Sequence, residues 1–286
     1  MNVIMYQSTK PRENVIGQAM LEGAVKHRVN FAIANKYDGV IPDADVAITI
    51  GVKGSSKLIM QEYRAAGKHV IYIDKGYYRI HSGDSENPLS HWRMAVDAFQ
   101  PLAYFQNAPR PVDRWELLGK KIQKRRNEGN DIVFAGSSEK YCTLHDLGHP
   151  TDYAEKIISQ IRIQRPGSTI IYRPKPSWGA ATEISGTVFS TAKRKLVMEM
   201  ANACAVVTHG SNAALDAIMF GVPALVLGDG IAKPMSMQRI EDLRVPYMPK
   251  RRTIKQWVQD VAYCQFTLAE MADGTAWTIL REQLDK

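Results

Sequence analysis

The stretch from residue 205 to residue 228, AVVTHGSNAALDAIMFGVPALVLG, constrains the fold more than any other part of the chain. Two apolar runs, Ala205–Val207 and Ala224–Leu227, enclose a polar turn and a short helical segment. An uninterrupted apolar run is typical of a strand buried on both faces, as in a parallel sheet. Ser211 or Asn212 suits a helix N-cap, and a Gly-Val-Pro sequence ends the helix. The stretch therefore predicts a strand–helix–strand unit of a parallel α/β sheet.

The turn of this unit has the composition of an anion site. Small residues at Gly210, Ala213 and Ala214 let another molecule approach the first helical turn. Free backbone N–H groups and the helix dipole favour negative charge there. Asp216 lies on that first turn or just beyond it. We therefore expect a phosphate cradle with a carboxylate beside it.

The same residues resemble the donor-binding unit of two-domain (GT-B) glycosyltransferases and of the related UDP-sugar 2-epimerases. In those families a Ser/Gly turn opens the helix, and an acidic residue five before the G-[LV]-P break holds the nucleotide ribose. Asp216 stands at that place here, where the family commonly has Glu. The resemblance implies an α/β fold of two Rossmann-like domains facing a cleft, and a nucleotide-sugar donor. An ordinary Rossmann-like unit with a capped helix is the alternative interpretation.

The remaining sequence alternates apolar runs with helical patterns, as expected for two α/β domains. We expect an acceptor-side domain over 1–112 and a donor domain with C-terminal helices over 113–286, joined near Pro109–Pro111. The other expected strands are Asn2–Tyr6, Asp45–Ile50, Lys68–Asp74, Asp131–Ala135, Thr169–Tyr172 and Val188–Ser190. The other expected helices are Pro11–Lys26, Ser56–Ala66, 115–129, Thr151–Arg162, Arg194–Ala203, Thr253–Met271 and Trp277–Leu284.

The expected donor site lies at the carboxyl ends of the second domain's strands. Two turns offer backbone donors to a diphosphate, and the R-P-K-P turn, which resembles the basic-proline turn of capsule-type transferases, offers charge. His209 is expected to donate to a phosphate or to line the sugar site; the alternative is a histidine at a strand end whose hydrogen bonds are made within the protein. Asp229 is expected to contact sugar hydroxyls or, alternatively, to cap a loop. The expected donor residues are Gly136, Ser137, Ser138, Arg173, Lys175, His209, Gly210, Ser211, Asn212, Asp216 and Asp229.

The first domain is expected to supply the acceptor site and a general base. Asp74 is the leading base candidate because it ends a predicted strand; a turn-stabilising role is the alternative. His209 is the second candidate catalytic residue, and His27, His81 and Asp84 remain open. Retaining chemistry would need no such base. The expected acceptor residues are Lys53, Ser55, Lys75 and Arg79.

Metal and cofactor signals are weak. Asp43 and Asp45 match a D-x-D pattern, but they precede a strand, whereas carboxylates that serve a parallel sheet lie at its carboxyl ends. The G-x-x-G-S-S turn at 51–56 lacks the GK[ST] of a Walker loop. We therefore expect no metal and no cofactor beyond a nucleotide-sugar co-substrate, taken as a UDP-sugar.

The charge balance points to a polyanionic partner. The net charge is +8 and the pI about 9.3, which favours nucleic acid, an acidic glycan or an anionic membrane surface. A transferase of this size and charge suits DNA carrying a hydroxymethylated pyrimidine, as in phages. The alternatives are a surface-glycan transferase, a UDP-sugar epimerase and a non-catalytic nucleotide- or nucleic-acid-binding protein. Three scattered cysteines, and the absence of a signal-like or membrane-spanning run, lead us to expect a cytoplasmic protein.

Overall fold

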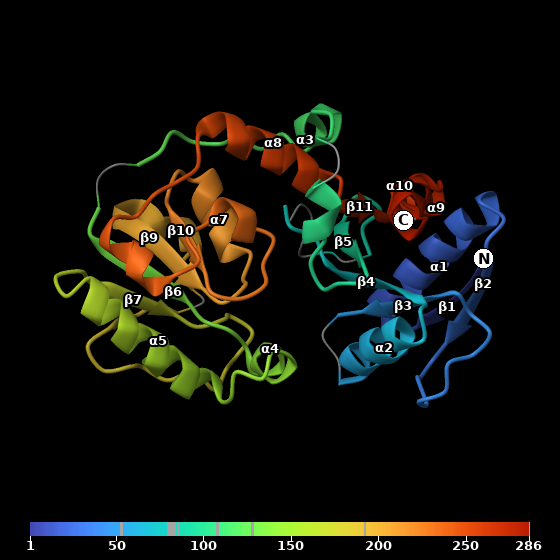
Figure 1. Ribbon diagram of the computed structural model, residues 1–286, viewed down its shortest axis with the longest axis horizontal. Helices are drawn as coiled ribbons and strands as arrows, with labels where there is room; N and C mark the ends of the chain where they lie inside the picture. Colours follow the sequence, from blue (N-terminus) through green and yellow to red (C-terminus); the bar gives the residue numbers. More distant parts are fainter. Residues whose placement is uncertain are drawn as a thin grey trace. The chain divides into compact units, whose positions relative to one another are not determined.

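The computed structural model describes residues 1–51, 54–78, 84, 86–106, 109–126, 129–191 and 193–285. These residues form two compact units (Figure 1). Unit 1 combines Met1–Leu118 with Val258–Lys286, and unit 2 is Gly119–Trp257. Each unit contains its own β-sheet, so the expected mixed α/β class with two Rossmann-like halves is confirmed.

Unit 1 is built on a six-stranded sheet in the order β11-β5-β4-β3-β1-β2. Strands β2, β1, β3 and β4 are parallel, whereas β5 is antiparallel to both β4 and β11. The strands are β1 (Asn2–Tyr6), β2 (Asn30–Ala34), β3 (Val46–Ile50), β4 (His69–Lys75), β5 (His91–Val96) and β11 (Gln265–Thr267). The parallel construction expected from the sequence therefore holds for four strands, and an antiparallel pair extends one edge.

The helices of unit 1 pack the two ends of the chain together. They are α1 (Pro11–Lys26), α2 (Gly54–Ala65), η1 (Leu102–Gln106), α3 (Asp113–Leu117), α9 (Leu268–Ala272) and α10 (Thr275–Leu284). Pro11 is suited to the start of α1, where its missing N–H costs no hydrogen bond. A Cβ on Gly23 would lie 2.0 Å from the carbonyl oxygen of Met271, so α1 and α9 are in close contact. The indole of buried Trp277 donates to the carbonyl of Met20 at 2.9 Å.

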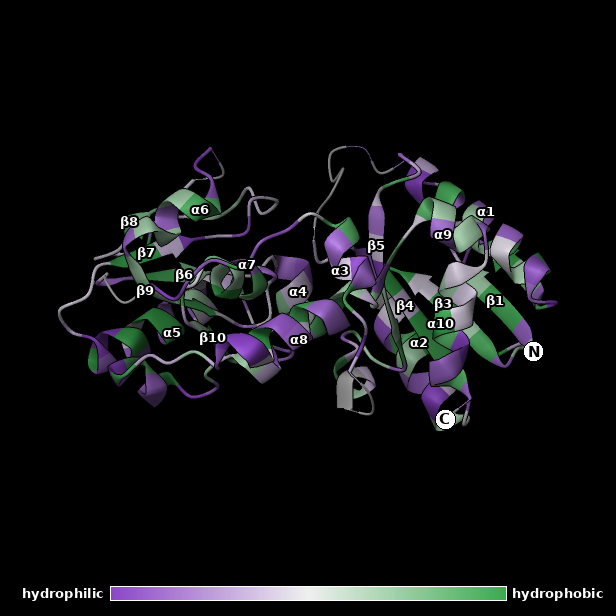
Figure 2. Cartoon of the chain, turned by 90° about the horizontal axis from the view of Figure 1, so that it is seen from above, coloured by the Kyte–Doolittle hydropathy of each residue, from purple (hydrophilic) through white to green (hydrophobic). Residues whose placement is uncertain are grey.

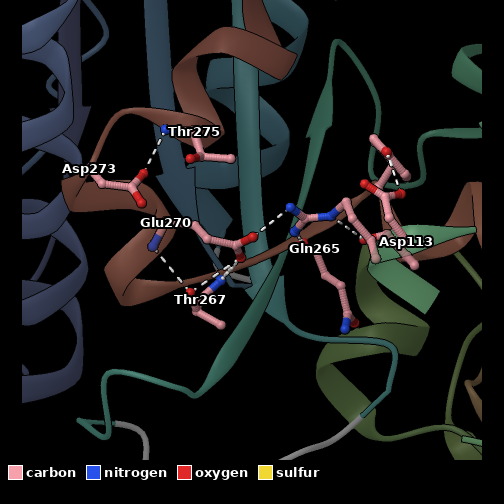
Figure 3. Close-up of polar contacts among 9 residues, drawn as sticks. Asp113, Gln265, Thr267, Glu270, Asp273 and Thr275 are labelled. Atoms are coloured by element: carbon pink, nitrogen blue, oxygen red, sulfur yellow. Dashed lines mark hydrogen bonds and ion pairs between the residues drawn. The ribbon is translucent and has the colours of Figure 1, made fainter. Parts of the chain in front are cut away.

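Arg114 ties α3 to the C-terminal segment. Its guanidinium pairs with Glu270 at 2.5 Å and donates to the carbonyl of Gln265 at 2.8 Å. Glu270 in turn forms a capping box with Thr267 at the start of α9 (Figure 3). Residues 113–118 and 258–286 therefore belong to unit 1, whereas the division expected at 112/113 placed them in the second domain.

Unit 2 contains a five-stranded parallel sheet in the order β10-β9-β6-β7-β8. Its strands are β6 (Asp131–Ala135), β7 (Ile170–Arg173), β8 (Val188–Phe189), β9 (Ala203–Thr208) and β10 (Ala224–Val226). Strands β6, β9 and β10 are buried on both faces, with Ile132, Val206 and Leu225 fully inaccessible. Continuous apolar runs thus predicted this sheet, including the strand–helix–strand unit at 205–228.

The helices of unit 2 are short, except for two. They are α4 (Glu139–Leu144), α5 (Pro150–Gln164), α6 (Leu196–Glu199), η2 (Met200–Asn202), α7 (Ala213–Met219), η3 (Lys233–Met235), η4 (Ile240–Arg244) and α8 (Arg251–Ala262), which continues into unit 1. Thr253–Met271, expected as one helix, is broken into α8, β11 and α9. No helix within the described residues is long and apolar enough to cross a bilayer.

The segment 119–126, which we call the strap, has no regular secondary structure, so the helix expected over 115–129 is wrong for these residues. Gly119 adopts a φ of 60°, which ends α3. The strap then uses its backbone to bond the end of α7: Gln123 N–H donates to Met219 and Arg126 N–H donates to Gly221. The charge pattern looked helical, but these tertiary bonds replace the helical ones.

Candidate functional site

The strand order of unit 2 reverses between β6 and β9. From β6 the chain proceeds to β7 and β8 on one side, whereas β9 and β10 lie on the other. In open α/β sheets, ligands bind beyond the carboxyl ends of the strands at such a reversal. The two loops that leave the sheet at this point are Gly136–Ser138 and His209–Asn212. Both had been selected from the sequence.

His209 is the centre of a cluster at this reversal. Its Nδ1 lies 2.7 Å from the hydroxyl of Tyr153. The rings of Tyr153, His145 and Tyr141 lie 5.5, 5.6 and 5.9 Å from the imidazole, centroid to centroid. These three rings come from α4, its C-cap and α5, so sequence reasoning about local motifs missed them. The only feature of the sequence that could have predicted this contact is that the three residues follow β6, the strand next to β9.

The environment keeps His209 neutral. Burial lowers the pKa of His209 to about 4, with further lowering from the neighbouring His145 and Lys233. When Tyr153 donates to Nδ1, the single proton of the neutral ring lies on Nε2. His209 therefore offers one N–H donor at neutral pH and no positive charge.

Two glycines allow the loops at this edge to meet. A Cβ on Gly210 would lie 2.2 Å from both the carbonyl oxygen of Asp229 and the hydroxyl of Tyr141. A Cβ on Gly228 would lie 2.0 Å from Nε2 of His209. Larger residues at either position would separate the loop after β9 from the loop after β10.

Two exposed carboxylates lie on the segments that follow β9 and β10. Asp229 pairs with Lys233 at 3.1 Å, and its side chain is 65% exposed. Asp216 is exposed in the first turn of α7, as expected for a residue that contacts a ligand. Ser211 precedes the N-cap residue Asn212, and its Oγ accepts from the N–H of Ala213 at 3.2 Å. Thr208 anchors the turn by donating to the carbonyl of Ala135.

Arg173 is held at the neighbouring strand ends. Its guanidinium donates to Oγ of Ser190 at 2.9 Å and to the carbonyl of Thr191 at 3.2 Å. Ser190 in turn donates to buried Glu199 at 2.5 Å. Burial lowers the pKa of Arg173, but the group stays charged at any physiological pH. Lys175 is exposed two residues further along.

In unit 1, Asp74 has structural partners. One oxygen lies 3.1 Å from Arg93 and 3.2 Å from the hydroxyl of Tyr72, and the other accepts from the N–H of Lys75 at 2.8 Å. Its role as a base stays a prediction. Ser55 and Lys75 are exposed, and Asp45 accepts from the N–H of Asn2 at the opposite edge of the sheet. Three further candidates lie outside the described residues: Lys53, Arg79 and His81.

Unit 1 has its own reversal, between β1 and β3. Glu13, in the first turn of α1, is fully buried there and accepts from the N–H of Ser8 at 2.7 Å. Sequence reasoning missed this residue because acidic residues are common in first helical turns, where the dipole favours them. Glu13 is a further carboxylate to consider in unit 1 beside Asp74 and Asp84.

Comparisons with known proteins give structural matches alone. No protein-family profile matches the sequence, and no curated protein matches it. Two structures of Thermosulfurimonas dismutans KpsC are similar, both at 12% identity. The beta Kdo 2,4 transferase has a TM-score of 0.60 and covers 92% of this chain and 91% of its own. The beta Kdo 2,7 transferase has a TM-score of 0.56 and covers 99% and 100%. At this identity the likeness concerns the fold, and it agrees with the resemblance noted from residues 205–228: the chain has the fold of GT-B glycosyltransferases.

Proposed function

We propose that this protein is a glycosyltransferase that moves a sugar from a nucleotide-sugar donor to a hydroxyl acceptor. The observation that carries the proposal is the cluster at the β6/β9 reversal of unit 2. Two glycine-containing strand-end loops leave the sheet there, and Asp216, an exposed carboxylate, lies in the first turn of the helix that follows one of them. The resemblance to GT-B families supports a nucleotide at this position. The fold is that of transferases, and this supports the reaction class.

The residues at this edge suit the departure of a nucleotide diphosphate. Asp216 is proposed to hold the ribose hydroxyls, and Lys175 and Arg173 to stabilise the negative charge of the leaving group. His209 is proposed to contribute a neutral Nε2–H donor, which contacts a phosphate or sugar oxygen without competing for a proton. A UDP-sugar is the first donor to test.

We favour a glycan hydroxyl over DNA as the acceptor. Unit 1, the expected acceptor side, contains 16 Lys and Arg against 17 Asp and Glu, a net charge of −1. A protein that binds duplex DNA neutralises its phosphates with a basic surface, which this balance does not provide. The similar KpsC structures are named as Kdo transferases, which supports a sugar as the group transferred. The hydroxymethylated DNA acceptor expected from the sequence has no support in the comparisons.

Calorimetric titration with UDP, CMP and GDP tests the donor site. Asp216→Asn should weaken nucleotide binding about tenfold to a hundredfold, because it removes hydrogen bonds to a charged acceptor. Glu155→Gln is the matched control, since it removes a carboxylate from an exposed position of α5 and should leave affinity unchanged. Release of nucleotide from a sugar donor, with labelling of an oligosaccharide, then tests transfer. Equal affinity of wild type and Asp216→Asn would refute the ribose role.

A further inference from the structure

The net positive charge of this protein comes entirely from unit 2. Residues 119–257 contain 21 Lys and Arg against 12 Asp and Glu, a net charge of +9, whereas the whole chain carries +8. A nucleotide pocket needs a few of these cations and does not explain such an excess. The distribution points to a separate anionic partner of unit 2.

The segments 119–126 and 250–257 contain nine of the Lys and Arg residues of unit 2. Arg251, at the start of α8, donates to the carbonyls of Ile122 and Gln123 at 2.9 Å each, which fixes α8 against the strap. Neither 119–126 nor 250–257 contains an acidic residue, and the start of α8 is hydrophilic (Figure 2). We call this set the basic edge: Lys120, Lys121, Lys124, Arg125, Arg126, Lys250, Arg251, Arg252 and Lys255.

The basic edge is not part of the nucleotide site. The strap bonds to Met219 and Gly221 at the end of α7, whereas the nucleotide site is at its beginning. Arg126 also donates to the carbonyl of Ala201, two residues before β9 starts. These contacts place the strap at the amino-terminal edge of the parallel sheet, opposite the carboxyl edge.

The arrangement is unfavourable for stability alone. Cations in the first turn of α8 oppose the helix dipole, and Arg251 and Lys255 are like charges one turn apart. The strap adds five further cations beside them. A polyanion bound here would relieve this repulsion, so the charge pattern is explained by binding.

Exposed apolar side chains beside the cations select the type of partner. Val245 is 79% and Tyr247 is 49% exposed, on a loop that Arg125 joins by donating to the carbonyl of Pro246 at 3.1 Å. Acidic residues on the preceding η4 contact Arg239, which lies at its N-cap. Exposed valine and tyrosine on a loop that a basic segment contacts match the headgroup region of an anionic bilayer, where apolar tips insert and cations contact lipid phosphates. The phosphates of duplex DNA would need the cations alone.

We propose that the basic edge, with Val245 and Tyr247, docks unit 2 on an anionic phospholipid surface. This inference does not depend on the proposed transferase activity. Co-sedimentation with vesicles of phosphatidylcholine containing 30% phosphatidylglycerol should capture the full chain at low salt, and vesicles of phosphatidylcholine alone should not.

Matched variants distinguish a defined surface from general charge. Lys121→Gln, Lys124→Gln and Lys255→Gln together should weaken binding on the order of a hundredfold, because each lysine near such a surface contributes about fivefold. Lys156→Gln, Lys193→Gln and Lys195→Gln together remove the same charge from exposed positions elsewhere in unit 2 and should change binding several-fold at most. Val245→Ser with Tyr247→Ser should weaken binding and leave its salt dependence unchanged.

Three results would overturn the proposal. They are equal capture by neutral and anionic vesicles, equal effects of the two triple variants, and duplex DNA binding without vesicle binding. Nucleotide affinity, measured on the same variants, should equal that of the wild type. If lipid binding fails while nucleotide binding persists, this inference is wrong and the proposed function stands. If lipid binding persists while nucleotide binding fails, the proposed function is wrong and this inference stands.

Discussion

The neutral state of His209 leads to a quantitative prediction about pH. The pKa of this group is about 4 in the folded protein and about 6.5 in an unfolded chain. Between these values the unfolded chain binds the additional proton, so the free energy of unfolding falls as the pH falls. At pH 5 the difference corresponds to at most about 2 kcal/mol lost relative to neutral pH, by the linkage relation, because solvent screens a partly buried group. The loss approaches its limit of about 3 kcal/mol below pH 4.

Two measurements check this prediction. Proton NMR of protein with isotope-labelled histidine should show one imidazole that titrates near pH 4, and this resonance should be absent from His209→Gln. Urea unfolding at pH 7.5 and pH 5 should show that wild type loses about 2 kcal/mol more than His209→Gln, since all other titrating groups are shared. Tyr153→Phe should keep the ring packed but remove its hydrogen bond to Nδ1. A His209 midpoint near 6.5 would refute the burial argument and allow a cationic imidazole at the site.

Two further predictions concern packing. Gly210→Ala should lower the thermal midpoint of unit 2, because its Cβ would lie 2.2 Å from the backbone of Asp229. The control Gly167→Ala has no atom within 4 Å of the added Cβ and should leave the midpoint nearly unchanged. Equal midpoints of the two variants would contradict the close approach at Gly210. Arg114→Gln should destabilise unit 1 by about 3 kcal/mol, since it removes the cation paired with a partly buried carboxylate and a donor to two carbonyls. Arg64→Gln, at an exposed position of α2, is its control in urea unfolding.

Continuous apolar runs made most of the sheets predictable. Asn2–Tyr6 and Asp131–Ala135 are strands with the expected bounds, because each is buried and flanked by polar residues. Strand β5, His91–Val96, was not expected, since its sequence HWRMAV places Arg93 in the middle. The structure accommodates this cation by pairing it with Asp74 and packing it 5.3 Å from the ring centre of Tyr77. Such compensation depends on tertiary neighbours, which local periodicity does not reveal.

The strap illustrates the opposite error. Its sequence has good helix formers and a helical charge pattern, yet 119–126 has no regular secondary structure. Gly119 interrupts the helix, and a Cβ on Gly221 would lie 2.0 Å from the carbonyl oxygen of Lys124, so the strap packs tightly on the end of α7. Tertiary contacts outweighed a propensity of a few tenths of a kcal/mol per residue.

The candidate site was predictable where it depends on topology and unpredictable where it depends on packing. A parallel sheet places every loop after a strand at one edge, so Gly136–Ser138 and His209–Asn212 could be assigned to one neighbourhood from their order alone. Tyr153 comes to His209 across 56 residues, and no spacing in the sequence encodes that contact. The same rule applied to unit 1 leads from β1 and β3 to buried Glu13, whereas sequence reasoning selected Asp74 at the end of β4. Burial and strand order thus separate two carboxylates that look equivalent in the sequence: Asp74 accepts bonds from Arg93 and its own strand, and Glu13 lies at the reversal where a ligand is expected.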